Sequence, residues 1–241
     1  MKSSDYRDSH KHKGAEYDST IQSSAFDAYM DKWEEHHLAQ VLSRLFPTRI
    51  PRYLDFACGT GRITRRVEAR ADESVGVDVS ESMLTQARSK CRATRFVCAD
   101  LTRSDAEPGL FDLVTAFRFF ANAQDDLRSA VLTAVNRRLR PGGYLIINNH
   151  RNPRSFLGVA SRLAGGGDEP DLTYFKLRNL LRRQGFEIDY QRAIGFWILR
   201  FKLTSAECLG SALASRLERA FQYAWFAPFA PDTLLVARKV A

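Results

Sequence analysis

The chain has few of the features that mark secreted, metal-binding or membrane-spanning proteins. Its 241 residues include only four cysteines, at positions 58, 91, 98 and 208, and their spacing is not that of a metal site or a disulfide framework. No apolar run approaches the roughly 18 residues that a membrane span needs, and the first residues contain no apolar signal core. We therefore expect a cytoplasmic protein with reduced cysteines, no metal and no transmembrane segment.

The chain also has no long block of positive charge, although its formal net charge is +8. The arginines occur as scattered pairs, such as 65–66, 137–138 and 182–183. Such pairs are typical of exposed helix faces, which argues against a dedicated nucleic-acid surface. The excess of positive charge still favours binding of anionic metabolites or contact with an anionic membrane surface.

The hydrophobic pattern divides the chain into a short tail and one domain. Residues 1–20 are polar and without periodicity, which predicts a flexible tail or lid. Residues 21–241 are expected to form a single domain, in which apolar residues at helical spacing predict a helical cap over 21–50. Strand-like and helix-like segments then alternate: strands near 53–56, 75–78, 95–99, 113–117, 144–148, 186–190 and 232–238, with helices near 61–69, 81–91, 125–139, 171–184 and 206–223. This alternation predicts an α/β protein with a mostly parallel sheet covered on both faces, and a ligand cleft outside the carboxyl ends of the strands.

The most informative stretch is a glycine-rich turn between the first strand and the following helix. Leu54 to Arg62 reads L-D-F-A-C-G-T-G-R, and the next apolar run ends at Asp78, about twenty residues later. Glycines allow a ligand to approach the backbone at a helix N-terminus, and an acidic residue at that distance can accept hydrogen bonds from a ribose diol. The alternative is an ordinary turn followed by a charge at a helix N-terminus.

Five segments in register resemble the motifs of the class I S-adenosyl-L-methionine (SAM)-dependent methyltransferases. They are D-x-x-C-G-T-G at 55–61, V-D-V-S at 77–80, F-V-C-A-D at 96–100, F-D-L-V-T-A at 111–116 and L-R-P-G-G-Y-L-I-I at 139–147. The resemblance covers roughly residues 50 to 241. It implies a Rossmann-like fold with a seven-stranded, mostly parallel sheet and an antiparallel last strand inserted between strands five and six. It also implies SAM as the cofactor, S-adenosyl-L-homocysteine as the product and no metal.

The resemblance assigns cofactor roles residue by residue. Gly59 and Gly61 would admit the amino-acid part of SAM, and Asp55 would fix the loop or the ammonium group. Asp78 would bind the ribose diol. The remaining cofactor candidates are Met83 against the adenine ring, Asp100 with the Leu101 backbone at the adenine amino group, Phe117, and Tyr17 in the lid. For Met83 the alternative is core packing, and for Asp100 it is a solvated loop position.

Polar residues after strands four and five mark the expected acceptor side. Arg118 would hold an anionic group of the substrate or the SAM carboxylate, the alternative being a surface ion pair. The fifth strand runs into Asn148-Asn149-His150-Arg151-Asn152, where His150 is suited to accept a hydroxyl proton and Asn149 and Asn152 to orient the substrate. A structural hydrogen-bonding role is the alternative for His150. An N/D-P-P-Y/F motif is missing after strand four, which argues against adenine or glutamine amino groups as acceptors.

The sequence thus predicts a methyltransferase acting on a small-molecule or sugar hydroxyl, loosely similar to bacterial enzymes of small metabolites and glycans. Two alternatives stay open: an RNA or protein methyltransferase, and a SAM-binding protein without catalysis. The apolar loop 224–231 is suited to line an acceptor site, to form a dimer contact or to meet a lipid-linked acceptor at a membrane face. The sequence leaves the oligomeric state open.

Overall fold

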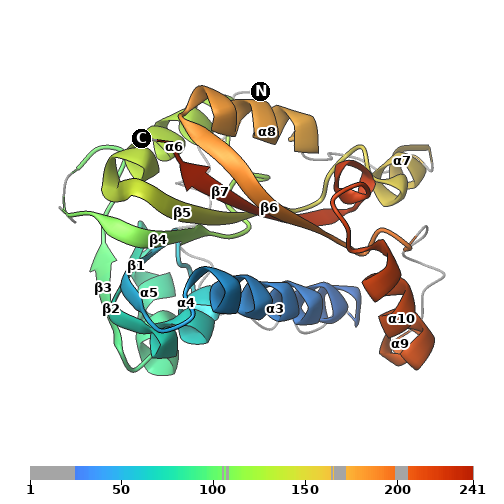
Figure 1. Ribbon diagram of the computed structural model, residues 1–241, viewed down its shortest axis with the longest axis horizontal. Helices are drawn as coiled ribbons and strands as arrows, with labels where there is room; N and C mark the ends of the chain where they lie inside the picture. Colours follow the sequence, from blue (N-terminus) through green and yellow to red (C-terminus); the bar gives the residue numbers. More distant parts are fainter. Residues whose placement is uncertain are drawn as a thin grey trace.

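The computed structural model describes residues 25–104, 106, 109–163, 165, 172–198 and 206–240. These residues form one continuous sheet with helices on both faces (Figure 1). In chain order the elements are α3 (Ala25–Leu45), β1 (Ile50–Phe56), α4 (Arg62–Val67), η1 (Glu68–Arg70), β2 (Ala71–Asp78), α5 (Glu81–Lys90), β3 (Thr94–Cys98), β4 (Phe111–Ala116), α6 (Asp125–Arg138), β5 (Leu139–Asn149), α7 (Phe156–Leu163), α8 (Tyr174–Arg183), β6 (Phe186–Ile194), α9 (Ala206–Gly210), α10 (Ala212–Phe221), η3 (Ala227–Phe229) and β7 (Asp232–Lys239).

The sheet has seven strands in the order β3-β2-β1-β4-β5-β7-β6. The pairs β1–β2, β2–β3, β1–β4 and β4–β5 are parallel, while β7 is antiparallel to both β5 and β6. The expected insertion of an antiparallel last strand between the fifth and sixth strands is confirmed. The strand order reverses between β1 and β4, and parallel α/β sheets bind ligands at the carboxyl ends of the strands beside such a reversal.

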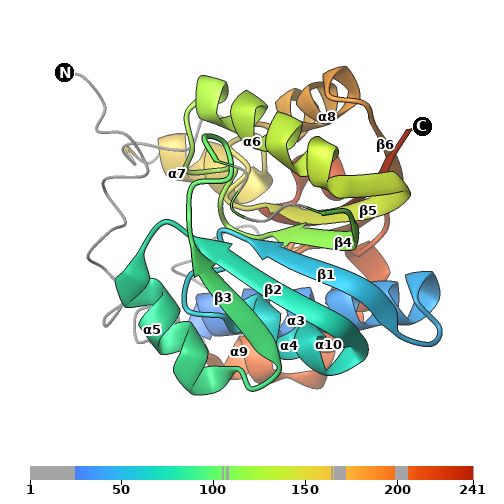
Figure 2. The same ribbon diagram turned by 90° about the vertical axis from the view of Figure 1, so that its left-hand side faces the viewer.

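Alternating side chains on each strand supply two apolar layers, one on each face of the sheet. Leu54 and Phe56 of β1 pack in the layer that includes α6 and α8, whereas Tyr53 packs in the layer that includes α3 and α10. Figures 1 and 2 show α6 and α8 on one face and α3, α4 and α5 on the other. Burial on both faces explains why the central strands are almost wholly apolar rather than alternating with polar residues.

Two local differences separate the predicted helices from the observed ones. Residues 156–163, which the sequence pattern left unassigned, form α7, and Ser155 starts this helix by accepting a hydrogen bond from Gly158 N at 3.0 Å. The single helix predicted over 206–223 is two helices. The predicted helix is interrupted at Ser211, because the Ser211 hydroxyl accepts a hydrogen bond from Ala214 N at 3.1 Å and caps the start of α10.

The predicted tail or lid over residues 1–20, and with it Tyr17, lies outside the described residues. The predicted helical cap corresponds to α3, which is in contact with β6 and β7. Within the described part of the chain, no helix has the length and apolar character needed to cross a membrane.

Candidate active site

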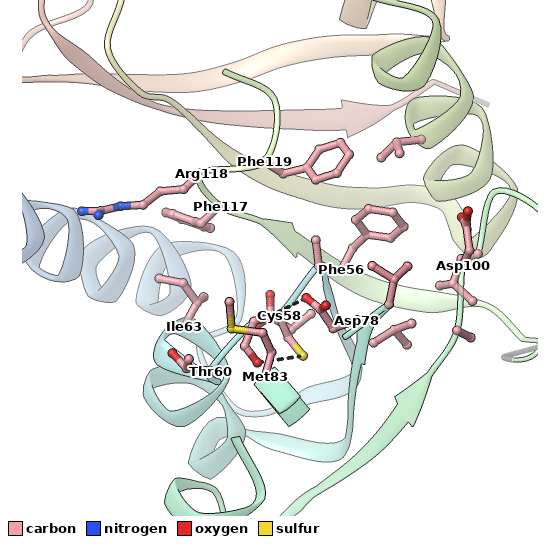
Figure 3. A pocket seen from close by; sticks show the side chains of 18 of the residues that line it. Phe56, Cys58, Thr60, Ile63, Asp78, Met83, Asp100, Phe117, Arg118 and Phe119 are labelled. Carbon is pink, nitrogen blue, oxygen red and sulfur yellow. Dashed lines mark hydrogen bonds between the residues drawn. The ribbon is translucent and has the colours of Figure 1, made fainter. Parts of the chain in front are cut away.

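A cavity opens at the carboxyl ends of β1, β2, β3 and β4, beside the strand-order reversal. Figure 3 shows Asp78 and Met83 together with Phe119 and Arg118 around it. The lining residues are Asp55, Phe56, Ala57, Cys58, Gly59, Thr60, Arg62, Ile63, Val77, Asp78, Val79, Met83, Ala99, Asp100, Leu101, Thr102, Phe117, Arg118, Phe119, Leu127 and Val131. Of the expected cofactor residues within the described part, all except Gly61 line this cavity.

The two glycines of the first loop have different structural roles. Both lie in the left-handed region, Gly59 with φ +53° and Gly61 with φ +76°. A Cβ at Gly59 would meet no atom within 4 Å, so this bare backbone faces open space. A Cβ at Gly61 would lie 3.0 Å from the Cβ of Ala87 and 3.1 Å from the Sγ of Cys91. Gly59 therefore leaves room in the cavity, whereas Gly61 allows the loop to pack against α5.

The Asp78 carboxylate joins the glycine loop to the start of α5. Its Oδ2 accepts from Gly59 N at 2.9 Å, and its Oδ1 accepts from Ser80 N at 2.9 Å. The Ser80 hydroxyl in turn caps α5 by accepting from Met83 N at 3.4 Å. The helix cap that the alternative interpretation required is thus made by Ser80, and Asp78 is held at the cavity wall.

Asp55 fixes the first strand to its neighbours. It is buried, and its two oxygens accept from the hydroxyls of Thr64 and Thr115, each at 2.6 Å. Burial raises the pKa of Asp55 to about 6 because the ionised carboxylate is poorly solvated there, although the threonine hydrogen bonds oppose the shift. These bonds join the carboxyl end of β1 to α4 and β4.

The far wall of the cavity combines apolar side chains with one acidic turn. Met83, Leu101 and Phe117 are each less than a tenth exposed and supply apolar surface. Asp100 Oδ1 accepts from both the backbone N and the hydroxyl of Thr102, at 2.9 and 2.6 Å. This local turn orients the Asp100 carboxylate at the cavity, so the residue is not merely solvated.

Arg118 begins the acceptor side and has a strained backbone, with φ +55°. Its N–H donates to Asn148 Oδ1 at 2.6 Å, and Asn148 Nδ2 donates to Glu34 Oε2 at 2.8 Å. Glu34 also pairs with Arg62 at 2.5 Å, so these bonds connect the ends of β4 and β5 with α3 and α4. The strained position is therefore held from several elements at once.

Arg118 is 9% exposed, and its side chain extends from the cavity toward α3 (Figure 3). Its Nε has no hydrogen-bond partner among the described residues. No ion pair involves this guanidinium in the described part of the chain, which differs from the surface ion pair that was its alternative. A buried cation at a cavity wall is suited to an anionic ligand group.

His150 forms a pair with a carboxylate that the sequence pattern did not single out. Its Nδ1 lies 2.8 Å from Asp232 Oδ2, and Asp232 Oδ1 accepts from Arg151 N at 3.1 Å. Burial favours the neutral acid, but His150 and Arg118 outweigh this and hold the pKa of Asp232 below its ordinary value. In the tautomer that donates from Nδ1 to this carboxylate, the Nε2 of His150 keeps its lone pair.

The only feature of the sequence that could have pointed to Asp232 was its position at the start of the last predicted strand. Because β7 runs antiparallel beside β5, with Asn149 opposite Thr233, the first residue of β7 meets the residue just after β5. The insertion of this strand was predicted from the sequence, but the register that brings position 232 to His150 was not.

The two asparagines flanking His150 are placed differently. Asn149 is fully buried, and neither its Oδ1 nor its Nδ2 has a hydrogen-bond partner among residues that the structure describes. Asn152 donates to the carbonyls of Pro228 and Ala230 at 2.8 and 3.1 Å, which ties the loop after β5 to the segment before β7. Neither asparagine, nor His150, lines the cavity itself.

The described residues contain no group of three or more histidine, cysteine, aspartate or glutamate side chains arranged to hold a metal. The cysteine thiol that lines the cavity, Cys58, is buried, and burial raises its pKa well above the usual range. This thiol is therefore protonated near neutral pH and is not an activated nucleophile.

Comparison with known proteins identifies the domain around this cavity. Residues 54–143, which run from β1 into the first half of β5, match the family model described as "Methyltransferase domain". This stretch of the chain is thus similar to a methyltransferase domain. The whole architecture agrees with this: a magnesium protoporphyrin IX methyltransferase from Synechocystis, solved with bound S-adenosylhomocysteine, superposes with TM-score 0.64 over 97% of both chains at 16% identity. The N-methyltransferase NodS from Bradyrhizobium japonicum gives TM-score 0.60 over 98% of this chain and 99% of its own, at 14% identity.

Relatives of the methyltransferase domain by sequence carry O-methyltransferase names. A malonyl-[acyl-carrier protein] O-methyltransferase from Enterobacter lignolyticus is 32% identical over 128 residues, which cover 51% of this chain and 50% of that protein. A ubiquinone biosynthesis O-methyltransferase from Methylococcus capsulatus is 29% identical over 111 residues, covering 43% and 46%. The chain thus spans about half the length of the curated relatives it matches.

Proposed function

We propose that the protein transfers the methyl group of SAM to a hydroxyl oxygen of a small-molecule or sugar acceptor, leaving S-adenosyl-L-homocysteine. One observation carries the proposal: a methyltransferase-family loop places the bare backbone of Gly59 and the carboxylate of Asp78 together on the wall of a cavity. The names of the relatives by sequence support oxygen as the atom methylated.

The residues present fit the proposed cofactor. At position 59, any residue other than glycine would place its side chain in the cavity. Asp78 offers carboxylate oxygens for ribose hydroxyls. Met83, Leu101 and Phe117 supply apolar surface for a purine ring, with Asp100 nearby as an acceptor for its amino group. When bound, SAM supplies an activated methyl group on a sulfonium, so the protein's main task is alignment.

On the acceptor side, His150 is the proposed general base. Its Nε2 would take the proton of the acceptor hydroxyl as the oxygen–methyl bond forms and the sulfur–methyl bond breaks. Asp232, which stays ionised, would stabilise the resulting imidazolium and fix the ring through Nδ1. Arg118 would hold an anionic group at the cavity wall, and the buried amide of Asn149 would bond the acceptor or a water that orients it.

The test is transfer of label from methyl-labelled SAM into host extract separated into lipid, small polar, RNA and protein fractions. The Asp78→Ala protein is the control for background labelling. Label in the small polar or lipid fraction, absent with the control, supports the proposal. Label confined to RNA or protein, or confirmed SAM binding with no transfer into any fraction, supports one of the two alternatives instead.

A further inference from the structure

An apolar surface lies beside the end of β5, formed by α7 and the segment around η3. Its exposed members are Phe156, Val159 and Leu163 on α7, with Trp225 and Phe229 from the η3 segment, and we refer to these five as the α7–η3 surface. Leu163 and Trp225 are each 85% exposed. The two parts are contiguous because the rings of Phe156 and Phe229 stack at 6.2 Å between centroids. Figure 1 shows α7 at the end of the sheet away from the chain's C-terminus.

This surface rests on a rigid aromatic base. Phe196 contacts Phe156 at 5.4 Å and Phe226 at 4.5 Å between ring centroids, and Phe221 packs against both Phe196 and Phe226. The exposed ring of Phe156 therefore packs on a cluster of aromatic rings beneath it. Large apolar side chains kept exposed on a fixed base indicate an interaction surface rather than incomplete packing.

The exposed charges in the two segments that carry this surface all have one sign. In the described segments 150–163 and 208–232, the exposed charged residues are Arg151, Arg154, Arg162, Arg216 and Arg219. The acidic residues of the same segments, Glu218 and Asp232, are buried and already hydrogen-bonded. None of these five arginines forms an ion pair with another described residue. The two segments thus present aromatic and aliphatic side chains within a rim of unneutralised arginine.

We propose that the α7–η3 surface docks on a lipid bilayer that contains anionic headgroups. Trp, Phe and Leu side chains bury in the boundary between headgroups and acyl chains, while arginines at their edge contact lipid phosphates. The charge of this rim, repeated in the net charge of +8, is what selects an anionic bilayer over a second copy of the chain. Only five residues separate His150 from the start of α7, so a docked molecule would hold the acceptor side close to the bilayer.

The first experiment measures co-sedimentation of the protein with phosphatidylcholine vesicles, with and without phosphatidylglycerol. The variant Leu163→Ser/Trp225→Ala should lose about tenfold or more in partitioning to the anionic vesicles, because its largest apolar contacts are gone. Leu110→Ser is the matched control. Leu110 is a 42% exposed leucine just before β4, at the opposite end of the sheet, and its loss should leave partitioning unchanged.

A second pair of variants separates the local arginines from net charge. Arg154→Gln/Arg162→Gln should weaken binding to anionic vesicles by about 25-fold, on the basis of roughly fivefold for each arginine at the surface. Arg182→Gln/Arg183→Gln removes the same charge from the exposed end of α8 and should change binding by less than about twofold.

Equal vesicle binding by the wild type and both surface variants would overturn the proposal. A dimer in light scattering that Leu163→Ser/Trp225→Ala converts to a monomer would also overturn it, since the surface would then be a contact between copies. Circular dichroism and SAM affinity, both expected to be unchanged, verify folding of every variant. Because vesicle binding is measured without methyl transfer, its failure leaves the proposed function standing, and failure of methyl transfer leaves the docking result standing.

Discussion

The two sides of the cleft differ in how completely their buried polar groups are bonded. On the cofactor side, formed by the loops after β1, β2 and β3, Asp55, Asp78 and Asp100 all accept hydrogen bonds from nearby protein groups. On the acceptor side, formed by the ends of β4 and β5, the start of β7 and the covering helix α3, Arg118 Nε and the Asn149 amide have no partner among the described residues. Unbonded buried polar groups cost free energy, so their retention on one side indicates where a ligand completes the bonding.

Backbone strain occurs on both sides of the cleft, at one residue that carries a side chain on the cofactor side and at two on the acceptor side. On the cofactor side the left-handed positions are two glycines and Ala57, whereas on the acceptor side they are Arg118 and Arg151, which carry long side chains. Left-handed backbone costs a residue with a side chain roughly 1–2 kcal/mol. The carboxylates of the cofactor side are thus bonded within the protein, whereas unbonded buried polar atoms remain on the acceptor side, as expected if the proposed substrate binds there.

The largest predicted effect comes from replacing the proposed base, His150. His150→Gln should lower kcat by about 10²- to 10⁴-fold while SAM affinity stays unchanged, because the residue acts on the acceptor and not on the cofactor. Asp232→Asn, which removes the charge that orients His150, should cause a smaller loss of the same kind. Single-turnover methyl transfer and calorimetric SAM binding measure the two effects.

The matched control for this variant is His36→Gln. His36 is an exposed histidine on α3, so its replacement should leave activity unchanged. Full activity in His150→Gln, or a parallel loss of SAM affinity, would remove the separation between the two sides.

The second prediction concerns SAM affinity and the cofactor side. Asp78→Ala should weaken SAM binding by about 100-fold, since it removes a charged acceptor and frees the Gly59 and Ser80 N–H groups that it holds. Isothermal titration calorimetry measures the affinity. Asp72→Ala, in the same strand but exposed and paired with Arg49, is the control that should bind normally. Unchanged affinity in Asp78→Ala would show that the assigned cofactor wall is wrong.

The two loop glycines should separate binding from stability. Gly61→Ala should cost about 3 kcal/mol of unfolding free energy, because its left-handed backbone is strained and its Cβ meets Ala87 and Cys91. Gly59→Ala should cost only about 1 kcal/mol, because its Cβ meets nothing, yet it should reduce SAM affinity more by entering the cavity. Urea unfolding and calorimetry on both variants provide the comparison, and equal affinity losses would contradict it.

The last prediction concerns the pH dependence of stability and helix α3. Burial lowers the pKa of His37 to about 4, so the folded protein keeps this ring neutral while the unfolded chain protonates it below about 6.5. This group's contribution to stability is therefore complete above pH 6.5 and is lost as pH falls toward 4, by about 2 kcal/mol between pH 7 and 5. His37→Leu should remove that acid-dependent loss in urea unfolding, whereas the exposed-site variant His36→Leu should retain it.

Asp55, on the cofactor side, acts in the opposite direction. Its pKa is raised to about 6, so the folded state takes up a proton before the unfolded state does and gains stability as pH falls below about 6. A His37→Leu protein whose stability still falls between pH 7 and 5 as steeply as the wild type would contradict the assignment of the acid loss to α3.

Most of the cofactor side could be predicted from the sequence because its parts are close together along the chain. The turn from Leu54 to Arg62 forms one strand–loop–helix unit, and Asp78 ends the adjacent strand, so parallel pairing alone brings them together. The distinct functions of Gly59 and Gly61 could not be read from the pattern, because they depend on whether a helix packs against each Cα. Tyr17 stays a prediction, since it lies outside the described residues.

The amino-acid sequence alone was enough to predict the alternating strands and helices, the parallel sheet with its inserted last strand, and Gly59, Asp78 and Asp100 as cofactor candidates. The alternation of strands and helices follows from short-range periodicity, whereas the inserted last strand and the three cofactor candidates follow from the motif resemblance. Only the tertiary structure decided that Asp232, 82 residues away, pairs with His150 and that Glu34 of α3 braces Asn148. Such contacts join segments that are distant in the chain, and they are fixed by strand register and by packing between layers, which no local pattern encodes.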